Sequence, residues 1–243
     1  MAFIGLLGCS PRPGNNGPGS DASTVEGDAY ATARERMVRQ QLSAPVRGIT
    51  NARVLDVMRQ VPRHELVAPQ LRDRAYDDHP LPIGHGQTIS QPYIVAFMTE
   101  KLEPKPDDRV LEVGTGSGYQ AAVLARLVKE VYTIEIVEPL ARRAEADLIR
   151  LGYTNVHVRA GDGYQGWPEA APFDAIIVTC APEAVPQPLV TQLKDGGRMI
   201  IPVGPFGEQQ LILLRKEAGR LEQKDVLPVR FVPMTGEATR TPR

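Results

Sequence analysis

Short apolar segments alternate with amphipathic segments through the second half of this sequence, and that alternation constrains the fold more than any other feature. Strand and helix pairs are predicted at Arg109–Val113 and Gln120–Val128, at Val131–Ile136 and Pro139–Leu151, and at Phe173–Thr179 and Pro186–Leu193. Buried strands that alternate with helices form a parallel sheet with helices on both faces. We therefore predict a doubly wound α/β fold.

Further strands are predicted at Val156–Ala160, Arg198–Val203, Gln210–Lys216 and Leu227–Phe231, which brings the sheet to about seven strands. Gly207 and Gly219 bound the last strands, and no helical segment lies between them. Strands joined by short turns pair in antiparallel orientation. The sheet is therefore expected to be mostly parallel, with an antiparallel edge.

The segment before the sheet is predicted to be mainly helical. Helices are expected at Ala31–Leu42, at Asn51–Gln60 and at Ser90–Leu102, with Pro92 in the first turn of the last one. The stretch Val61–Gln87 has no clear periodicity. A chain of 243 residues can build one substantial core. We expect a single domain over residues 30–243, with N-terminal helices (30–105) and a sheet core with edge strands (106–243).

The first 29 residues differ in composition from the rest. From Cys9 to Asp28 the chain is rich in Gly, Pro, Asn and Ser, and such a segment buries too little surface to offset its ordering entropy. Residues 1–29 are therefore predicted to be a disordered tail or a leader remnant. Leu6-Leu7-Gly8-Cys9 resembles a bacterial lipoprotein cleavage box. No Lys or Arg precedes the short apolar stretch, so lipoprotein-like export through Cys9 is the minor alternative.

Composition and charge exclude several classes of protein. The chain has 28 Lys and Arg against 29 Asp and Glu, and a net charge of -1 argues against binding nucleic acid by bulk charge. No apolar run approaches the roughly 20 residues of a membrane-spanning helix. The 2 cysteines and 4 histidines show no metal-ligand spacing, so no metal centre is expected.

A glycine-rich turn carries the strongest functional signal. The run Glu112-Val113-Gly114-Thr115-Gly116-Ser117-Gly118 ends a predicted strand and opens a helix, at the sheet edge where open α/β folds bind ligands. Its GxGxG spacing misses the third glycine of the dinucleotide fingerprint. A carboxylate at Glu112 would repel a pyrophosphate but would attract a cationic amino group. S-adenosylmethionine has such a group and carries no phosphates.

Two more acids follow the next two predicted strands. Glu135, before Ile136, lies 21 residues after Gly114, at the distance where an acid accepts ribose hydroxyls, although that feature is shared by NAD sites. Asp162, before Gly163, could accept the adenine amino group. Each acid alone could be a solvated strand end. Three acids at successive strand ends favour a nucleoside ligand.

The glycine run resembles the first motif of class I S-adenosylmethionine-dependent methyltransferases, and other motifs narrow the resemblance. They are Val61-Pro62-Arg63, Leu81-Pro82-Ile83-Gly84-His85-Gly86-Gln87-Thr88-Ile89-Ser90-Gln91-Pro92, Gly161-Asp162-Gly163-Tyr164-Gln165-Gly166-Trp167, Phe173-Asp174-Ala175-Ile176-Ile177-Val178-Thr179, Leu193-Lys194-Asp195-Gly196-Gly197 and Arg230-Phe231-Val232-Pro233. Together, in order from about Tyr30 to Glu237, they resemble the protein-L-isoaspartate O-methyltransferase family. The Gly-Gln-Thr-Ile-Ser stretch is specific to that family, whereas the glycine run is not.

The resemblance implies a repair enzyme. It would methylate the α-carboxylate of L-isoaspartyl residues in damaged proteins and peptides, and the ester would close to a succinimide that partly hydrolyses to normal aspartate. We further expect a monomer that has no nucleic-acid partner and no membrane span. Since S-adenosylmethionine is made in the cytoplasm, we expect a cytoplasmic enzyme.

The resemblance assigns roles to particular residues. Ser90 matches the active-site serine, and it also fits a helix N-cap, so the two roles are weighed together. The expected substrate-binding residues are Thr88, Ile89, Thr179, Cys180, Ala181, Pro182, Arg230 and Val232. The expected cofactor-binding residues are Glu112, Gly114, Thr115, Gly116, Ser117, Gly118, Glu135, Ile136, Asp162 and Gly163. Residues 30–105 would then face the substrate, and residues 106–243 would bind the cofactor.

The residues by themselves leave other functions open. A methyltransferase could act on RNA or on a small molecule, but the near-zero net charge and the absence of an Asn/Asp-Pro-Pro-aromatic motif count against RNA. An NAD-dependent oxidoreductase is disfavoured by the GxGxG spacing and by Glu112. A non-catalytic binding protein on the same fold is the last alternative.

Overall fold

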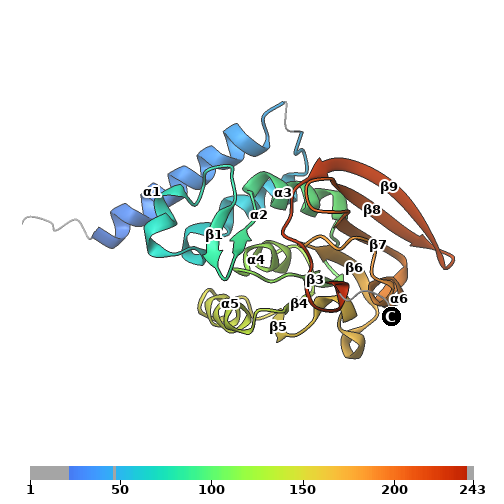
Figure 1. The fold of residues 1–243 in the computed structure, drawn as a ribbon. Coiled ribbons are helices and arrows are strands. Elements are labelled where there is room, and N and C mark those ends of the chain that lie inside the picture. Colours follow the sequence, from blue (N-terminus) through green and yellow to red (C-terminus); the bar gives the residue numbers. More distant parts are fainter. Residues whose placement is uncertain (1–21, 46–47, 240–243) are drawn as a thin grey trace, which may run out of the picture.

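The computed structural model describes residues 22–45 and 48–239, and it contains the predicted doubly wound sheet (Figure 1). The seven strands lie in the order β5-β4-β3-β6-β7-β8-β9. Their bounds are β3 Arg109–Val113, β4 Glu130–Glu135, β5 Val156–Ala160, β6 Phe173–Val178, β7 Leu193–Val203, β8 Gln209–Glu217 and β9 Arg220–Val229. The first five run parallel, while β8 and β9 are antiparallel, which confirms the predicted edge.

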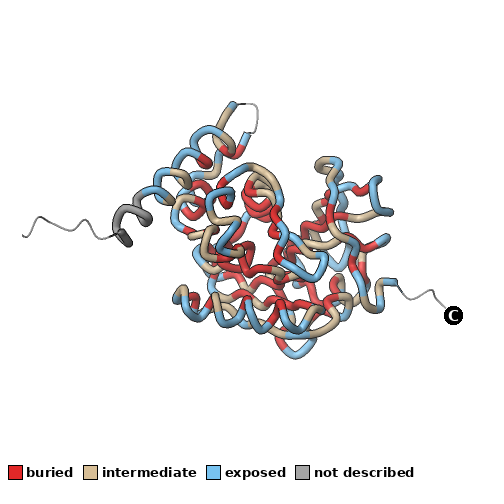
Figure 2. Tube along the Cα trace, turned by 60° about the vertical axis from the view of Figure 1, so that its left-hand side comes forward, coloured by how far each residue is buried: buried red, intermediate tan, exposed pale blue. Residues whose placement is uncertain are grey.

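Helices cover both faces of the sheet. Besides the N-terminal helix, the α-helices are α2 Ala52–Gln60, α3 Pro92–Leu102, α4 Tyr119–Ala125, α5 Glu138–Arg150 and α6 Gln187–Gln192. Alternate strand residues point to opposite faces. Val110 and Ile177 therefore pack with the cluster that includes α2 to α5, whereas Leu111 and Ile176 pack with Leu189 of α6 on the other face. The buried strands form the centre of the molecule (Figure 2).

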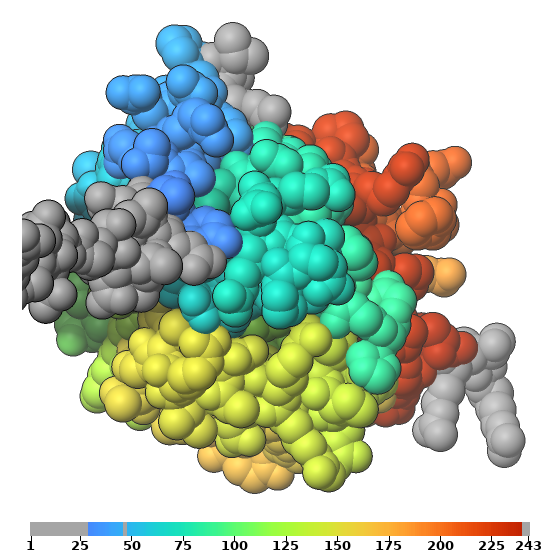
Figure 3. Space-filling model, turned by 90° about the vertical axis from the view of Figure 1, so that its left-hand side faces the viewer, coloured from blue at the N-terminus to red at the C-terminus, as the bar shows by residue number. Residues whose placement is uncertain are grey.

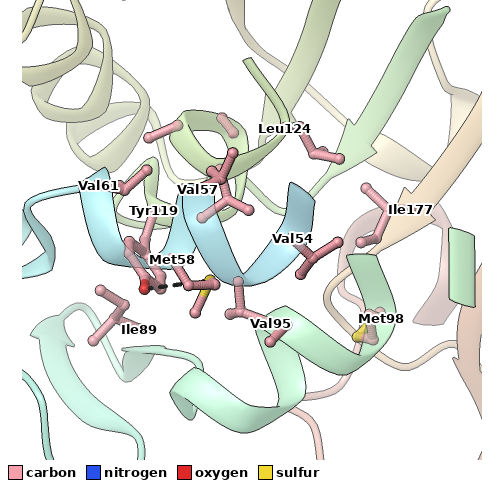
Figure 4. Close-up of a cluster of buried hydrophobic side chains, with 14 of the residues drawn as sticks. Val54, Val57, Met58, Val61, Ile89, Val95, Met98, Tyr119, Leu124 and Ile177 are labelled. Carbon is pink, nitrogen blue, oxygen red and sulfur yellow. Dashed lines mark hydrogen bonds between the residues drawn. The ribbon is translucent and has the colours of Figure 1, made fainter. Parts of the chain in front are cut away.

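Packing of α2 on α3 builds much of the first cluster. Val54 and Met58 of α2 lie toward Val95 and Met98 of α3, whereas Val57 points toward α4, and all five are buried (Figure 4). Their spacing follows the 3.6-residue period of a helix, which is why the sequence revealed both helices. Asn51 begins α2, because its side chain accepts the backbone N–H groups of residues 53 and 54.

The N-terminal helix is longer than predicted. Helix α1 spans Ala22–Met37 and continues as a π-helical turn at Val38–Leu42, so the expected tail at 1–29 was too long by the helical residues 22–29. Alanines at 22, 29, 31 and 33 favour a helix even without an apolar stripe. Residues 1–21, with the cleavage-box motif at Leu6–Cys9, lie outside the described residues. No helix in the described ranges is long and apolar enough to cross a membrane.

A β-hairpin was missed in the stretch predicted to be irregular. Its strands are β1 Leu81–Gly84 and β2 Gln87–Ile89, and short 3₁₀ helices occur at Arg63–Leu66, Pro69–Arg74, Gly163–Gln165, Pro168–Ala170 and Gly236–Thr239. The hairpin is too short to show strand periodicity. Contacts outside it hold it in place, because Arg143 of α5 donates a hydrogen bond to the Ile83 carbonyl at 3.0 Å. Figure 3 shows the segment around residues 60–85 packed against the α5 region.

The last strand also differs from its prediction. Strand β9 begins at Arg220 and ends at Val229, whereas the apolar pattern indicated Leu227–Phe231. Its first six residues are exposed and mostly polar, so hydrogen bonding to β8 rather than burial makes them a strand. Charged residues on an edge strand also oppose edge-to-edge aggregation.

A buried ion pair joins elements at the amino end of β3. The guanidinium of Arg198 on β7 contacts the Asp108 carboxylate, and both side chains are almost fully buried. Arg198 also donates hydrogen bonds to the carbonyls of Leu102 at 2.6 Å, Glu103 at 2.7 Å and Asp174 at 3.1 Å. One side chain thus connects the end of α3, the start of β3, β6 and β7.

We predict that Arg198→Met lowers the free energy of unfolding by about 3–5 kcal/mol, because it leaves the Asp108 carboxylate buried without its cation. The matched control is Arg215→Met, which removes an exposed ion pair with Glu103 and should cost less than about 1 kcal/mol. Urea denaturation of both variants measures the difference. Equal losses would contradict the role given to the buried pair.

Candidate active site

A single cavity lies at the carboxyl edge of the parallel strands, where the sequence placed the site. It encloses about 770 Å³ of space, part of which is open to solvent. Most of its lining comes from three groups of residues: those of the glycine run and β4 (Glu112–Ser117, Ile134–Ile136), those of β2 and the residue after it (Gln87–Ser90), and those of two further loops (Thr179, Cys180, Val232–Thr235). Pockets of this size bind ligands of nucleoside size.

The glycine run approaches the neighbouring loop closely. Gly114 has φ +101°, a conformation that side-chain-bearing residues avoid, and a Cβ there would collide with the Thr179 hydroxyl. That hydroxyl donates a hydrogen bond to the Gly114 carbonyl at 2.7 Å. The glycine therefore lets the loops after β3 and β6 meet at the cavity floor.

Glu112 is a fully buried carboxylic acid on the cavity wall. Its Oε2 accepts a hydrogen bond from the Thr133 hydroxyl at 2.6 Å, and Thr133 in turn lies 2.6 Å from the Thr115 hydroxyl. Its Oε1 has no hydrogen-bond partner among the described residues. Burial, with a smaller contribution from Glu135, raises the pKa of Glu112 to about 8. A buried oxygen without a donor fits a ligand that brings its own donor, such as an ammonium group.

Glu135 braces the glycine run from the end of β4. Its Oε2 accepts the Gly116 N–H at 2.8 Å, and its Oε1 accepts the Val137 N–H at 3.0 Å. The side chain is buried yet lines the cavity, so each oxygen keeps a lone pair for a ligand. The next residue, Ile136, also lines the cavity and is 42% exposed there. An exposed apolar side chain beside an acid fits the flat face of a nucleoside.

Asp162 does not line the cavity. Its carboxylate accepts the Tyr164 N–H at 2.9 Å and, from the C-terminal segment, the Glu237 N–H at 2.7 Å. The neighbouring Gly163 does line the cavity, whereas Gly118 does not. The structure thus shows Asp162 holding the C-terminal segment against the sheet, a contact that the sequence did not predict.

The acceptor side of the cavity is formed by strand β2 and the residue after it. Thr88, Ile89 and Ser90 all line the cavity. Ser90 directly precedes Gln91, which is the N-cap of α3 and makes no side-chain capping bond. The N-cap role weighed for Ser90 was therefore wrong. Its hydroxyl makes no hydrogen bond to any residue in the described ranges, so it is available to a ligand.

The opposite wall contains only some of the expected substrate-binding residues. Thr179, Cys180 and Val232 line the cavity, whereas Ala181, Pro182 and Arg230 do not. Ala181 instead holds the C-terminal segment, because its N–H donates to the Val232 carbonyl at 2.9 Å and its carbonyl accepts the Met234 N–H at 2.8 Å. Burial raises the pKa of the Cys180 thiol to about 12, so this thiol stays protonated and is a poor nucleophile.

Several lining residues were missed by the sequence analysis. They are Gln87, Val113, Val95, Tyr119, Gln120, Ile134, Pro233, Met234 and Thr235. Residues 233–235 continue the Arg230–Pro233 motif, and that motif could have indicated that they also line the cavity. Helix residues such as Tyr119 have an ordinary core pattern, so nothing local distinguishes them. No group of three or more potential metal ligands occurs in the described parts of the chain.

Comparison with known proteins supports the same kind of function as the cavity does. The family model for protein-L-isoaspartate(D-aspartate) O-methyltransferase matches residues 33–239. A protein-L-isoaspartate O-methyltransferase from Opitutus terrae is 59% identical over 86% of this chain and 89% of its own length. One from Gloeobacter violaceus is 58% identical over 83% of this chain and 98% of its own length.

Solved structures agree with the sequence comparison. A protein-L-isoaspartate O-methyltransferase superposes with a TM-score of 0.75 at 31% identity, over 84% of this chain and 67% of that one. A Plasmodium falciparum structure described as a protein-L-isoaspartate O-methyltransferase, in complex with S-adenosyl-L-homocysteine, gives 0.73 at 27% identity, over 83% of this chain and 98% of that one. The chain described above belongs to the protein-L-isoaspartate O-methyltransferase family.

Proposed function

We propose that this protein transfers a methyl group from S-adenosylmethionine to the α-carboxylate of L-isoaspartyl residues in damaged proteins and peptides. The proposal rests on one observation: the cavity has one wall suited to a cofactor and another wall suited to an acceptor. One half has the glycine run with the unpaired Glu112 oxygen, and the other has the free Ser90 hydroxyl. The cavity would accept many carboxylates, and family membership supports the isoaspartyl carboxylate as the acceptor.

The first half suits the cofactor. Glu112 would accept hydrogen bonds from the ammonium group, and Glu135 would accept them from the ribose hydroxyls, while Ile136 would pack on the adenine ring. The backbone of the glycine run would lie along the ligand, where side chains would block its approach. Gly163 would border the adenine edge, while the Asp162 carboxylate, which does not line the cavity, keeps its two backbone donors.

The second half suits a carboxylate acceptor. When bound, S-adenosylmethionine supplies an activated methyl group to the acceptor oxygen. A carboxylate is already ionised at neutral pH, so no general base is required of the chain. Ser90 and Thr88 would donate hydrogen bonds that orient the acceptor, and alignment with exclusion of water supplies the rate gain. Because the Cys180 thiol stays protonated, it would not compete with the acceptor for the methyl group.

The partners follow from this chemistry. The acceptors would be isoaspartyl-containing polypeptides, and the resulting methyl ester would close to a succinimide without further help from the enzyme. With a net charge of -1, the protein is proposed to act without nucleic acid. It is further proposed to be a monomer and to work in the cytoplasm, where its methyl donor is made.

The proposal predicts transfer of label from methyl-labelled S-adenosylmethionine to one of two peptides that differ only in an isoaspartyl or a normal aspartyl linkage. The isoaspartyl peptide alone should acquire base-labile label, because a methyl ester hydrolyses in base. Label on neither peptide, with cofactor binding intact in calorimetry, would indicate another acceptor. Label on both would remove the repair role.

Ser90→Ala should lower kcat on the isoaspartyl peptide about 10- to 100-fold, which corresponds to losing a hydrogen bond to a charged group. The affinity for S-adenosylhomocysteine should change less than about twofold, since the hydroxyl lies on the acceptor side. Ser43→Ala, far from the cavity, is the matched control. An unchanged kcat would show that Ser90 does not orient the acceptor.

Glu112→Gln should stabilise the ligand-free protein increasingly as pH rises. The folded pKa of Glu112, about 8, lies above its unfolded value of 4.5. Between these pH values the unfolded chain releases this proton while the folded protein retains it, so the free energy of unfolding falls as pH rises. Glutamine removes that loss, so the melting temperatures of variant and wild type should diverge over this range. The variant should also bind S-adenosylhomocysteine about 10-fold or more weakly. Parallel melting curves, like those expected for exposed Glu145→Gln, would contradict this account.

A further inference from the structure

The start of α3 is held by an acid from a distant segment. Gln91 is the N-cap and Pro92 has no N–H, so the first helical N–H that needs an acceptor belongs to Tyr93. Asp78 supplies it, because its Oδ1 accepts the Tyr93 N–H at 3.0 Å. Its Oδ2 accepts a hydrogen bond from the Gln91 side chain at 2.9 Å. A single carboxylate thus binds two groups at the helix start.

The chain between these partners is the β1–β2 hairpin. It leaves Asp78, passes through both strands and returns to Gln91, so the two hydrogen bonds close the base of the hairpin. Within it, Leu81 pairs with Ile89 at the end of the ladder. Ser90 therefore lies between two fixed neighbours: the strand ladder holds Ile89, and Asp78 holds Gln91.

The Ser90 hydroxyl takes no part in capping α3, whose N-cap residue is Gln91. A serine at a helix N-cap ordinarily accepts hydrogen bonds from the first N–H groups of the helix. Here the capping acceptor comes from Asp78, and the Ser90 hydroxyl has no hydrogen-bond partner in the described ranges. A carboxylate at a helix N-terminus is also favoured by the helix dipole, which stabilises the arrangement.

A buried cation, Arg63, interacts electrostatically with this carboxylate. Arg63, from the Val61-Pro62-Arg63 motif, is fully buried and donates one hydrogen bond, to the Ala75 carbonyl at 2.7 Å. Its guanidinium stacks 4.8 Å from the ring of Tyr119, a lining residue of the cavity. Burial lowers the pKa of Arg63 to about 10, while Tyr119, Tyr76 and Asp78 favour its charged form. The charge of Arg63 thus interacts with Tyr119 and, more weakly, with Asp78.

We propose that Asp78 is a positioning residue for methyl transfer: by binding Gln91 and Tyr93 it fixes the Ser90 hydroxyl against the acceptor carboxylate. The inference rests on the proposed function, in which Ser90 orients that carboxylate. Asp78 does not line the cavity, so it would touch neither the substrate nor the reacting atoms. Misplacing a catalytic contact by about 1 Å can lower the rate roughly 100-fold. Loss of the hydrogen bonds from Gln91 and Tyr93 to Asp78 should therefore lower kcat measurably.

The test compares two substitutions of Asp78. Alanine removes both acceptors, and Asp78→Ala should lower kcat on the isoaspartyl peptide about 10- to 100-fold with the S-adenosylhomocysteine Kd changed less than about twofold. Asparagine can still accept the Tyr93 N–H and can donate to a flipped Gln91 amide. Asp78→Asn should therefore keep kcat within about fivefold of the wild type. Exposed Asp77 is the matched control, and Asp77→Ala should behave as wild type.

A double variant separates positioning from stability. If Asp78 acts through Ser90, then Asp78→Ala combined with Ser90→Ala should turn over no more slowly than Ser90→Ala alone. Should Asp78→Ala fail to fold, Gln91→Leu removes one of the two hydrogen bonds and leaves the Tyr93 cap, and it should lower kcat with the cofactor Kd unchanged.

Three results would overturn the inference: wild-type kcat in Asp78→Ala or, if that variant fails to fold, in Gln91→Leu; rate losses that multiply in the double variant; or a cofactor Kd that weakens in step with kcat. Wild-type enzyme is assayed alongside. If it labels the isoaspartyl peptide, any of these results removes the role of Asp78 alone. If it labels neither peptide, the proposed function fails and the inference fails with it.

Discussion

The reversal of strand order at β3 is the constraint on which the site depends. The chain runs outward from β3 to β5 and then returns to β6 on the other side of β3. The loops after β3 and β6 therefore leave the sheet toward opposite faces, which opens a crevice at the carboxyl ends of the strands. Thr179 bridges the two loops at the base of that crevice through the Gly114 carbonyl. Every residue proposed to bind the cofactor is arranged around this point.

A buried carboxyl group lies at each end of β3, and the two differ in their partners. At the amino end, Asp108 is paired with Arg198, whose guanidinium also meets three carbonyl groups. At the carboxyl end, Glu112 keeps one oxygen without a partner in the described ranges, and its pKa is raised to about 8. The first arrangement stabilises the fold. The second costs stability in the ligand-free protein and is retained where a cationic ligand group would complete it.

Segments from outside the sheet complete the cavity, and acids hold them there. Asp78 holds the start of α3 beside the hairpin, and Asp162 holds the C-terminal segment beside Gly163. In both places a carboxylate accepts a backbone N–H from a distant part of the chain. The acceptor side of the site is therefore built by long-range hydrogen bonds, whereas the cofactor side is built largely within the strand ends and turns of the sheet.

Strand alternation, helical periodicity and the GxGxG spacing are local signals, and they were sufficient to predict the sheet, its antiparallel edge, the glycine turn and both acids that line the cavity. Ser90 and Glu135 were also identified from sequence, and both line the cavity. Three features became apparent only in the folded molecule: Asp78 accepts the first free N–H of α3, Asp162 binds the C-terminal segment, and residues 233–235 line the cavity. These contacts join residues that are far apart in the chain. Local sequence patterns cannot predict which distant N–H group will donate a hydrogen bond to a given carboxylate.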